Sequence, residues 1–282
     1  MKKAKIIILA GQSNAVGVGH VKFLSKHFPI DRIKKWLDGY PNVRINYFSH
    51  DKKSDGFIDT TVGCTEVSKY TTGPELGIAD ALDTKYPDEK FFIVKCAFGG
   101  TSLYRDWLSP SCDGYDAGSF ADQYEHMIRS LEAGMPIRAS WCYNELVKIT
   151  DESIKTLLAR EYSPEIISFC WMQGEADACA EETTRQYIKR YDAMLNDFKK
   201  AFSEYTANCV FADAGISEIW PLYKELNEEK RKYAEKSENR AYIDTIAAGL
   251  TTSNEPEEPD IYHYDSDCVI KLGHLFADTI KP

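Results

Sequence analysis

The stretch that decides the fold runs from residue 5 to residue 14 and reads Lys-Ile-Ile-Ile-Leu-Ala-Gly-Gln-Ser-Asn. Its apolar residues from Ile6 to Ala10 are consecutive, which is typical of a strand that is covered on both faces of a parallel sheet. Gly11 and Ser13 follow directly, so we expect a strand-to-helix turn that presents the Ser13 hydroxyl. Open parallel sheets bind ligands at the carboxyl ends of their strands. The stretch therefore predicts an α/β fold together with the place of its site.

Further apolar runs predict strands over Val43–Phe48, Phe91–Ala97, Glu165–Met172, Asn208–Asp213 and Ala241–Thr245. Between them, helical patterns predict helices over Pro74–Leu82, Glu181–Phe202, Pro221–Ser237 (polar and exposed) and Cys268–Ile280. Strands that alternate with helices indicate a parallel sheet of about five strands with helices on both faces. The segment 108–142 fits this alternation poorly and is interpreted as a possible insertion. We expect residues 1–282 to form a single domain.

The composition is that of an ordinary globular protein, with 43% hydrophobic and 28% charged residues in a chain of 282. This excludes a disordered, collagenous or coiled-coil chain. The formal net charge of −10 argues against a nucleic acid or an anionic membrane surface as partner and favours a neutral substrate.

Targeting signals are weak. No run of about 18 apolar residues is present, so no membrane-spanning helix is expected. The N-terminal Met-Lys-Lys followed by apolar residues imitates a signal peptide, but the apolar run is shorter than the usual core of about 7–15 residues. We expect a cytoplasmic protein as written, or a secreted or periplasmic one if a leader has been removed.

The eight cysteines contain no C-x-x-C pair, which argues against a structural zinc site. Cys96, Cys170 and Cys209 fall in apolar runs, so we interpret them as buried free thiols. Unpaired cysteines agree with a cytoplasmic protein.

Ser13 is either a nucleophile at the turn or an ordinary helix N-cap residue. Three other motifs fit the same loop less well. Gly17-x-Gly19 has Lys22 where the dinucleotide fingerprint needs its third glycine, and a P-loop ending in Gly-Lys-Ser/Thr is absent. The G-x-S-x-G elbow of α/β hydrolases is nearly matched, but in that fold several strands precede the nucleophile.

Other segments place polar groups after strands or before helices. The Gly73 amide precedes a helix, so it either helps to hold an oxyanion with the Ser13 amide or simply starts the helix. Gly99 and Gly100 follow a strand and allow a ligand to approach the backbone. Trp107 is either a sugar-stacking residue or a core tryptophan.

The apolar run that ends at Met172 is followed by Gln173, Glu175 and Asp177. The side-chain N–H of Gln173 could hold an oxyanion. Glu175 could orient a histidine or bind substrate, whereas Asp177 is better explained as a helix cap.

Asp260 stands three residues before His263, a spacing that allows the carboxylate to accept a hydrogen bond from Nδ1–H. Nε2 is then free to take the proton of a serine. Asp265 and Asp267 follow, but calcium-loop spacing is absent, and no metal site is expected.

Taken in order, these blocks resemble the SGNH (GDSL-type) hydrolase superfamily, and within it the sialate O-acetylesterase-like and carbohydrate esterase family six branch. The matching stretches are Gly-Gln-Ser-Asn at 11–14, Gly-Pro-Glu at 73–75, Gly-Gly-Thr at 99–101 with Trp107, Trp-Met-Gln-Gly-Glu at 171–175 and Asp-x-x-His at 260–263. Met172 replaces the usual histidine of its block, which we expect to alter a pocket wall and leave the chemistry intact.

The resemblance implies a flavodoxin-like, three-layer α/β/α sandwich and a serine esterase that removes O-acetyl groups from carbohydrates of the acetylxylan or sialic acid type. Ser13 would be the nucleophile and His263 the base, with Asp260 favoured over Glu175 as the acid. The oxyanion donors would be Ser13, Gly73 and Gln173, without any cofactor. Substrate contacts would come from Gln12, Asn14, Gly100, Thr101 and Trp107.

Two other functions stay open at this stage. One is a non-catalytic carbohydrate-binding module with Trp107, Tyr104 and Arg105 at its rim. The other is a flavodoxin-like phosphate or flavin binder that uses Ser13 and Asn14. The particular sugar and the oligomeric state are not decided by the sequence.

Overall fold

The computed structural model describes residues 2–49, 52–64, 70–117, 139–252, 255 and 260–281. Its main sheet has the strand order β10-β9-β8-β1-β7-β3, all parallel. These strands are β1 (Lys2–Gly11), β3 (Tyr40–Ser49), β7 (Phe91–Ala97), β8 (Tyr162–Met172), β9 (Val210–Ala214) and β10 (Arg240–Ile243). The described chain thus has six parallel strands where the sequence predicted about five.

Four short strands complete the sheets. β4 (Lys52–Lys53) and β5 (Ile58–Thr60) pair antiparallel with β3 at the edge of the main sheet. β2 (Gly19–His20) pairs with β6 (Thr71–Thr72) in a separate two-stranded sheet.

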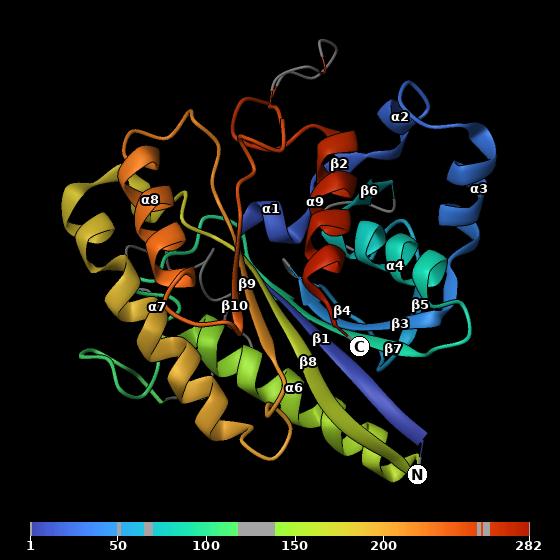
Figure 1. Ribbon diagram of the computed structural model, residues 1–282, viewed down its shortest axis with the longest axis horizontal. Helices are drawn as coiled ribbons and strands as arrows, with labels where there is room; N and C mark the ends of the chain where they lie inside the picture. Colours follow the sequence, from blue (N-terminus) through green and yellow to red (C-terminus); the bar gives the residue numbers. More distant parts are fainter. Residues whose placement is uncertain are drawn as a thin grey trace, which may run out of the picture.

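Helices cover both faces of the main sheet, which confirms the three-layer α/β/α architecture (Figure 1). One layer contains α3 (Ile30–Asp38), α4 (Pro74–Lys85) and α9 (Ser266–Thr279), and the other contains α6 (Trp141–Ala159), α7 (Glu181–Ala201) and α8 (Tyr223–Ala234). The short helices are α1 (Ser13–Val16), α2 (Val21–Leu24) and the 3₁₀ turn η1 (Asp177–Cys179). Within the described ranges, no helix is both long and apolar enough to cross a membrane.

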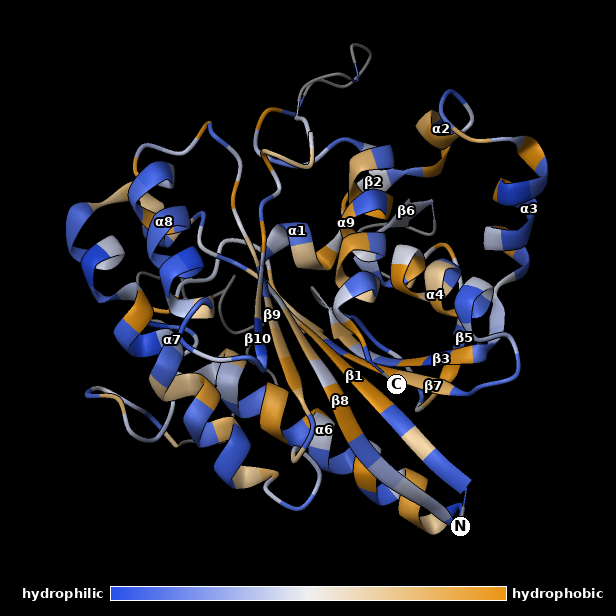
Figure 2. Cartoon of the chain, viewed as in Figure 1, coloured by the Kyte–Doolittle hydropathy of each residue, from blue (hydrophilic) through white to orange (hydrophobic). Residues whose placement is uncertain are grey.

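The central strands are covered on both faces, as their unbroken apolar runs predict. Every residue of β7 is buried, and Ile6 to Ala10 of β1 are completely inaccessible. Figure 2 shows hydrophobic residues concentrated in these strands and hydrophilic residues along the outer helices. Cys96, Cys170 and Cys209 are buried free thiols, as predicted. Burial raises the pKa of Cys170 to about 12, so this thiol is chemically inert.

Two predictions about helices need correction. α8 is not simply polar and exposed, because Leu226 and Lys230 on it are completely buried. Of the predicted insertion 108–142, residues 118–138 lie outside the described residues, and Trp141 and Cys142 begin α6. That helix packs on β7 and β8, and its buried residues recur at helical spacing, so the pattern was readable in the sequence.

The strand register brings the chemical blocks to one edge. Gly11 at the end of β1 is level with Ala97 of β7 on one side and with Met172 of β8 on the other. The segments that begin at Gln12, Phe98 and Gln173 therefore leave the sheet side by side. Gly11 has φ +143°, and an added Cβ would lie 1.9 Å from the Met172 carbonyl oxygen, so only glycine fits there.

Candidate active site

Ser13 is the first residue of α1, and Gln12 rather than Ser13 is the N-cap residue. This removes the interpretation of Ser13 as a capping serine. Its side chain is half-buried at the carboxyl edge of the sheet, where α1 lies in Figure 1. Within the described ranges, no hydrogen bond is made by the Ser13 hydroxyl.

The Gln12 side chain is buried and faces the protein interior. Its Oε1 accepts hydrogen bonds from Nε2 of Gln173 and from the backbone N–H of Ala176, both at 3.2 Å. Gln12 therefore joins the Ser13 turn to the block after β8 through Oε1, and the predicted contact of its side chain with substrate stays a prediction.

Asn14 is buried as well, and its amide connects the serine and histidine blocks. Nδ2 donates to Oε1 of Glu175 at 2.7 Å, and Oδ1 accepts from the backbone N–H of Tyr264 at 3.0 Å. Because Tyr264 follows His263 directly, this hydrogen bond holds the histidine segment against the residue next to Ser13. The predicted substrate contact of Asn14 is replaced by a positioning role.

Asp260 and His263 form the predicted hydrogen bond, with Oδ2 and Nδ1 2.6 Å apart. The other carboxylate oxygen accepts from the backbone N–H of Tyr262 at 3.0 Å. Burial alone would raise the pKa of Asp260, but these hydrogen bonds outweigh it and hold the pKa below its ordinary value. The acid therefore stays ionised, and Nε2 of His263 has no hydrogen bond to any described residue.

Glu175 is completely buried and is paired with Asn14 rather than with the histidine ring. Its second oxygen, Oε2, has no hydrogen-bond partner in the described part of the chain. Burial raises the pKa of Glu175, although the hydrogen bond from Asn14 and the charges of Lys230 and His263 act in the opposite direction. Of the two acids proposed from the sequence, Asp260 is the one that contacts His263.

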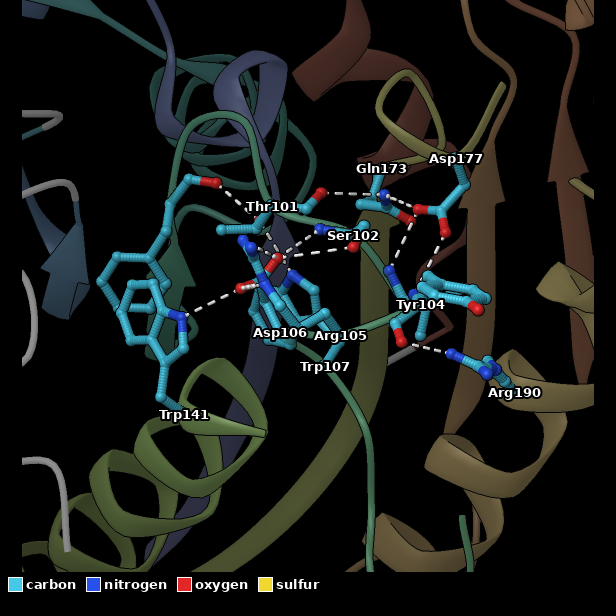
Figure 3. A network of polar contacts seen from close by, with 12 residues as sticks. Thr101, Ser102, Tyr104, Arg105, Asp106, Trp107, Trp141, Gln173, Asp177 and Arg190 are labelled. Carbon is cyan, nitrogen blue, oxygen red and sulfur yellow. Dashed lines mark hydrogen bonds and ion pairs between the residues drawn. The ribbon is translucent and has the colours of Figure 1, made fainter. Parts of the chain in front are cut away.

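Two buried carboxylates, those of Asp106 and Asp177, accept hydrogen bonds from the loop after β7 (Figure 3). Asp106 accepts from the backbone N–H of Ser102 at 2.9 Å and from Trp141 Nε1 at 3.2 Å. Arg105, which was proposed as a rim residue, also pairs with Asp106, at 2.9 Å from Nε to Oδ1. The loop is thereby fixed to the start of α6.

Asp177 is the second of these carboxylates. It accepts from the backbone N–H groups of Leu103 and Tyr104 at 3.0 and 3.1 Å. The interpretation of Asp177 as a cap of its own helix is therefore wrong. Burial raises its pKa to about 6, against the hydrogen bonds that favour the charged form.

Two predicted substrate contacts on this loop are buried. Trp107 is completely inaccessible, donates from Nε1 to Thr101 Oγ1 at 2.9 Å and packs edge-on against Trp171 with ring centroids 5.0 Å apart. Thr101 is 2% exposed and donates its hydroxyl to the Phe98 carbonyl. Both residues are core, whereas Gly100 is exposed as expected.

The predicted oxyanion donors Gly73 and Gln173 are engaged elsewhere. The Gly73 N–H donates to Oε1 of Glu75 at 2.9 Å. Nε2 of Gln173 lies 2.6 Å from Asp177 Oδ2 and 3.0 Å from the Thr101 carbonyl, and the side chain is fully buried. Neither N–H is free to face a developing charge.

Gly99 is the glycine that lies next to the serine. A Cβ added at Gly99 would lie 3.8 Å from Ser13 Cβ. Within the described ranges, no residue accepts a hydrogen bond from the backbone N–H of Ser13, Gly99 or Gly100. These amides are therefore the candidate donors to an oxyanion.

Two buried lysines that the sequence did not single out hold the site together. Lys95, completely buried on β7, donates to Glu75 Oε2 and to the Val16 carbonyl, both at 2.7 Å. Lys230 donates to the Gln173 carbonyl at 2.6 Å and lies 2.9 Å from Asp213 Oδ1. The signal for Lys95 was present, because a lysine inside the apolar run 91–97 needs a buried partner.

A serine at the turn after the first strand, with an Asp-His pair brought to it from the chain's other end, defines the class of SGNH-type hydrolases. Residues 3–281 match the sequence profile of the family described as carbohydrate esterase, sialic acid-specific acetylesterase, and the chain belongs to this family. It is therefore a carboxylic ester hydrolase, and the resemblance seen in the sequence is confirmed.

Solved structures agree on the fold. A protein from Arabidopsis thaliana is 20% identical with a TM-score of 0.61, covering 99% of this chain and 97% of its own. NanS is 15% identical with a TM-score of 0.65, covering 98% and 96%. A carbohydrate acetylesterase from Xanthomonas citri is 14% identical with a TM-score of 0.58, covering 98% of this chain and 55% of its own. Among curated proteins no sequence matches the chain.

Proposed function

We propose that this protein removes O-acetyl groups from carbohydrates through an acyl-enzyme formed on Ser13. The observation that carries the proposal is the Asp260–His263 hydrogen bond of 2.6 Å, on a segment that Asn14 ties to the nucleophile turn. The family and the acetylesterase among the structural neighbours support a carbohydrate acetyl ester as substrate.

In the proposed reaction, Nε2 of His263 takes the Ser13 proton while Oγ attacks the acetyl carbonyl. The carbonyl electrons move onto oxygen, where the N–H groups of Ser13 and Gly99 stabilise the charge. The C–O bond to the sugar then breaks, and His263 gives the proton to the departing sugar oxygen, which leaves as a hydroxyl. Water activated by the same histidine releases acetate and restores Ser13. Asp260 holds the imidazole tautomer and stabilises its charged form.

The test uses Ser13→Ala with Ser25→Ala as a matched control at an exposed serine. We expect wild type and the control to hydrolyse 4-nitrophenyl acetate and to be labelled by a fluorophosphonate probe. Ser13→Ala should do neither. Labelling or hydrolysis by Ser13→Ala at the wild-type rate would refute the proposal, and acetylated-sugar binding by wild type without acetate release would favour a binding module.

A further inference from the structure

Large apolar side chains are exposed next to the candidate active site. Ile261 and Tyr262, which lie between Asp260 and His263, are 48% and 54% exposed. Ile219, in the connection between β9 and α8, is 37% exposed. Figure 1 shows that this connection and the segment before α9 both lie at the sheet edge where α1 begins. An exposed apolar group at the edge of a catalytic site is a candidate for substrate contact.

The two segments meet through an aromatic pair, Trp220 and Tyr262, whose ring centroids are 5.7 Å apart at 42°. The Tyr262 backbone is held by Asp260 Oδ1, so its ring stands one residue from His263. The Trp220 segment is fixed to η1 by a hydrogen bond from Leu222 N–H to the Ala178 carbonyl at 3.0 Å. The pair is therefore built on the same elements as the site.

The chemistry proposed above does not use these rings, and core packing does not explain them, since Tyr262 is more than half exposed and Trp220 is half-buried. The indole N–H of Trp220 has no acceptor in the described part of the chain, so no hydrogen bond accounts for its position. Aromatic faces carry negative charge density and attract the weakly positive C–H groups of a flat apolar surface. A pyranose ring presents such a surface.

We propose that Trp220 and Tyr262 form a platform that stacks on the ring of an acetylated sugar and holds its ester over Ser13. This inference rests on the proposed function and assigns the alcohol side of the ester to the aromatic pair. An alternative role, in which Trp220 only braces the histidine segment through Tyr262, predicts a different kinetic pattern.

The experiment compares Trp220→Leu and Tyr262→Leu with the conservative Trp220→Phe and Tyr262→Phe. The substrates are a mono-O-acetylated methyl xyloside, ethyl acetate, which has no ring to stack, and O-acetylated N-acetylneuraminic acid. Leu37→Ala, at an exposed position on α3, is the control variant. We expect the leucine variants to raise KM for the xyloside by about 10-fold and to leave ethyl acetate hydrolysis unchanged. The phenylalanine variants should retain most of the affinity.

Two results would overturn the platform. An unchanged KM for the xyloside in both leucine variants would refute the contact. A loss of kcat on ethyl acetate as large as the loss on the xyloside would show that the pair only braces the His263 segment.

A failure of the proposed function can be told apart from a failure of the platform. If wild type hydrolyses none of the three esters and takes no fluorophosphonate label, the esterase mechanism is wrong. Calorimetric titration of the acetylated xyloside into Ser13→Ala, with and without Trp220→Leu, still tests the platform. Equal binding by both proteins would refute it.

Discussion

Asn14 donates its side-chain N–H to Glu175 across 2.7 Å, deep in the interior of the protein. The Oδ1 of the same amide accepts a hydrogen bond from the backbone N–H of Tyr264, so one side chain joins its own segment to two others that lie 161 and 250 residues further along the chain. Since Asn14 adjoins Ser13 and Tyr264 adjoins His263, this amide holds the Ser13 turn beside the His263 segment. Glu175 thereby acts on the geometry of the site, and Asp260 acts on the histidine ring itself.

The first prediction separates the two acids. Asp260→Asn should lower kcat on 4-nitrophenyl acetate by about 10³–10⁴-fold, because the amide no longer fixes the catalytic tautomer of His263. Glu175→Gln keeps an oxygen that can accept from Asn14, so we expect a loss within about 10-fold. Initial rates on both variants, with circular dichroism to verify folding, provide the measurement. A folded Glu175→Gln as inactive as Asp260→Asn would make Glu175 the acid of the triad.

The second prediction concerns Trp107, which the sequence analysis placed against a sugar. Its ring is inaccessible and its N–H is bonded to Thr101, so Trp107→Phe should lower the free energy of unfolding by about 1–3 kcal/mol. The KM for an acetylated xyloside should stay within a factor of about two of wild type. Urea unfolding and steady-state kinetics on the same preparation test both statements. A raised KM with an unchanged free energy of unfolding would show that Trp107 contacts the substrate.

The burial of Trp107 could not be predicted from the sequence. The unbroken apolar runs of β1 and β7 identify buried parallel strands because only such strands lack a polar face. A tryptophan at the end of a loop, in contrast, fits the rim and the core equally well. In the fold, Trp107 packs against Trp171 of β8, and this contact places Trp107 in the core.

The candidate oxyanion donors illustrate the same limit at the backbone. Gly73 precedes α4 and Gly99 precedes an irregular turn, and the sequence does not say which of the two amides is already hydrogen-bonded. Glu75 occupies the first, and strand register brings the second to Ser13. The pairing of Trp220 with Tyr262 is equally invisible, since 42 positions separate them in the chain and only the fold joins them.

The third prediction tests the contact between α4 and α9, the helix that follows the histidine segment. A Cβ added at Gly273 would lie 2.1 Å from the Pro74 carbonyl oxygen and 2.7 Å from Gly77 Cα. Helix propensity alone predicts that Gly273→Ala stabilises the protein by about 1 kcal/mol. The clash predicts the opposite effect, a decrease of about 1–3 kcal/mol in the free energy of unfolding. Because α9 would have to move, we also expect reduced esterase activity. Thermal or urea unfolding decides, and any gain in stability would contradict the close helix contact.

The last prediction concerns acid stability and rests on Asp80 in α4. Its buried carboxylate accepts hydrogen bonds from Tyr40 at 2.6 Å, His274 at 2.9 Å and Trp36 at 3.1 Å, and it also pairs with Arg32. Burial alone would raise the pKa of Asp80, but these partners outweigh it and hold the pKa well below its ordinary value of 3.8. The folded state therefore favours the ionised carboxylate.

A lowered pKa in the folded state means that this stabilisation is complete above the ordinary pKa of the unfolded chain and is lost as the pH falls below it. Asp80→Asn should reduce the free energy of unfolding at pH 7 by on the order of 2–3 kcal/mol, because it removes the charged acceptor. The difference from wild type should be constant from pH 7 to pH 5 and shrink below about pH 4, because the Asp80 carboxylate of the unfolded wild-type chain then takes up a proton while that of the folded chain stays ionised. Urea unfolding of both proteins at pH 7, 5, 4 and 3 measures this difference.

Asp278→Asn, at an exposed partner of Lys85, serves as the control and should change the free energy of unfolding by less than about 1 kcal/mol. A difference as large at pH 3 as at pH 7 would show that the Asp80 charge does not provide the stabilisation.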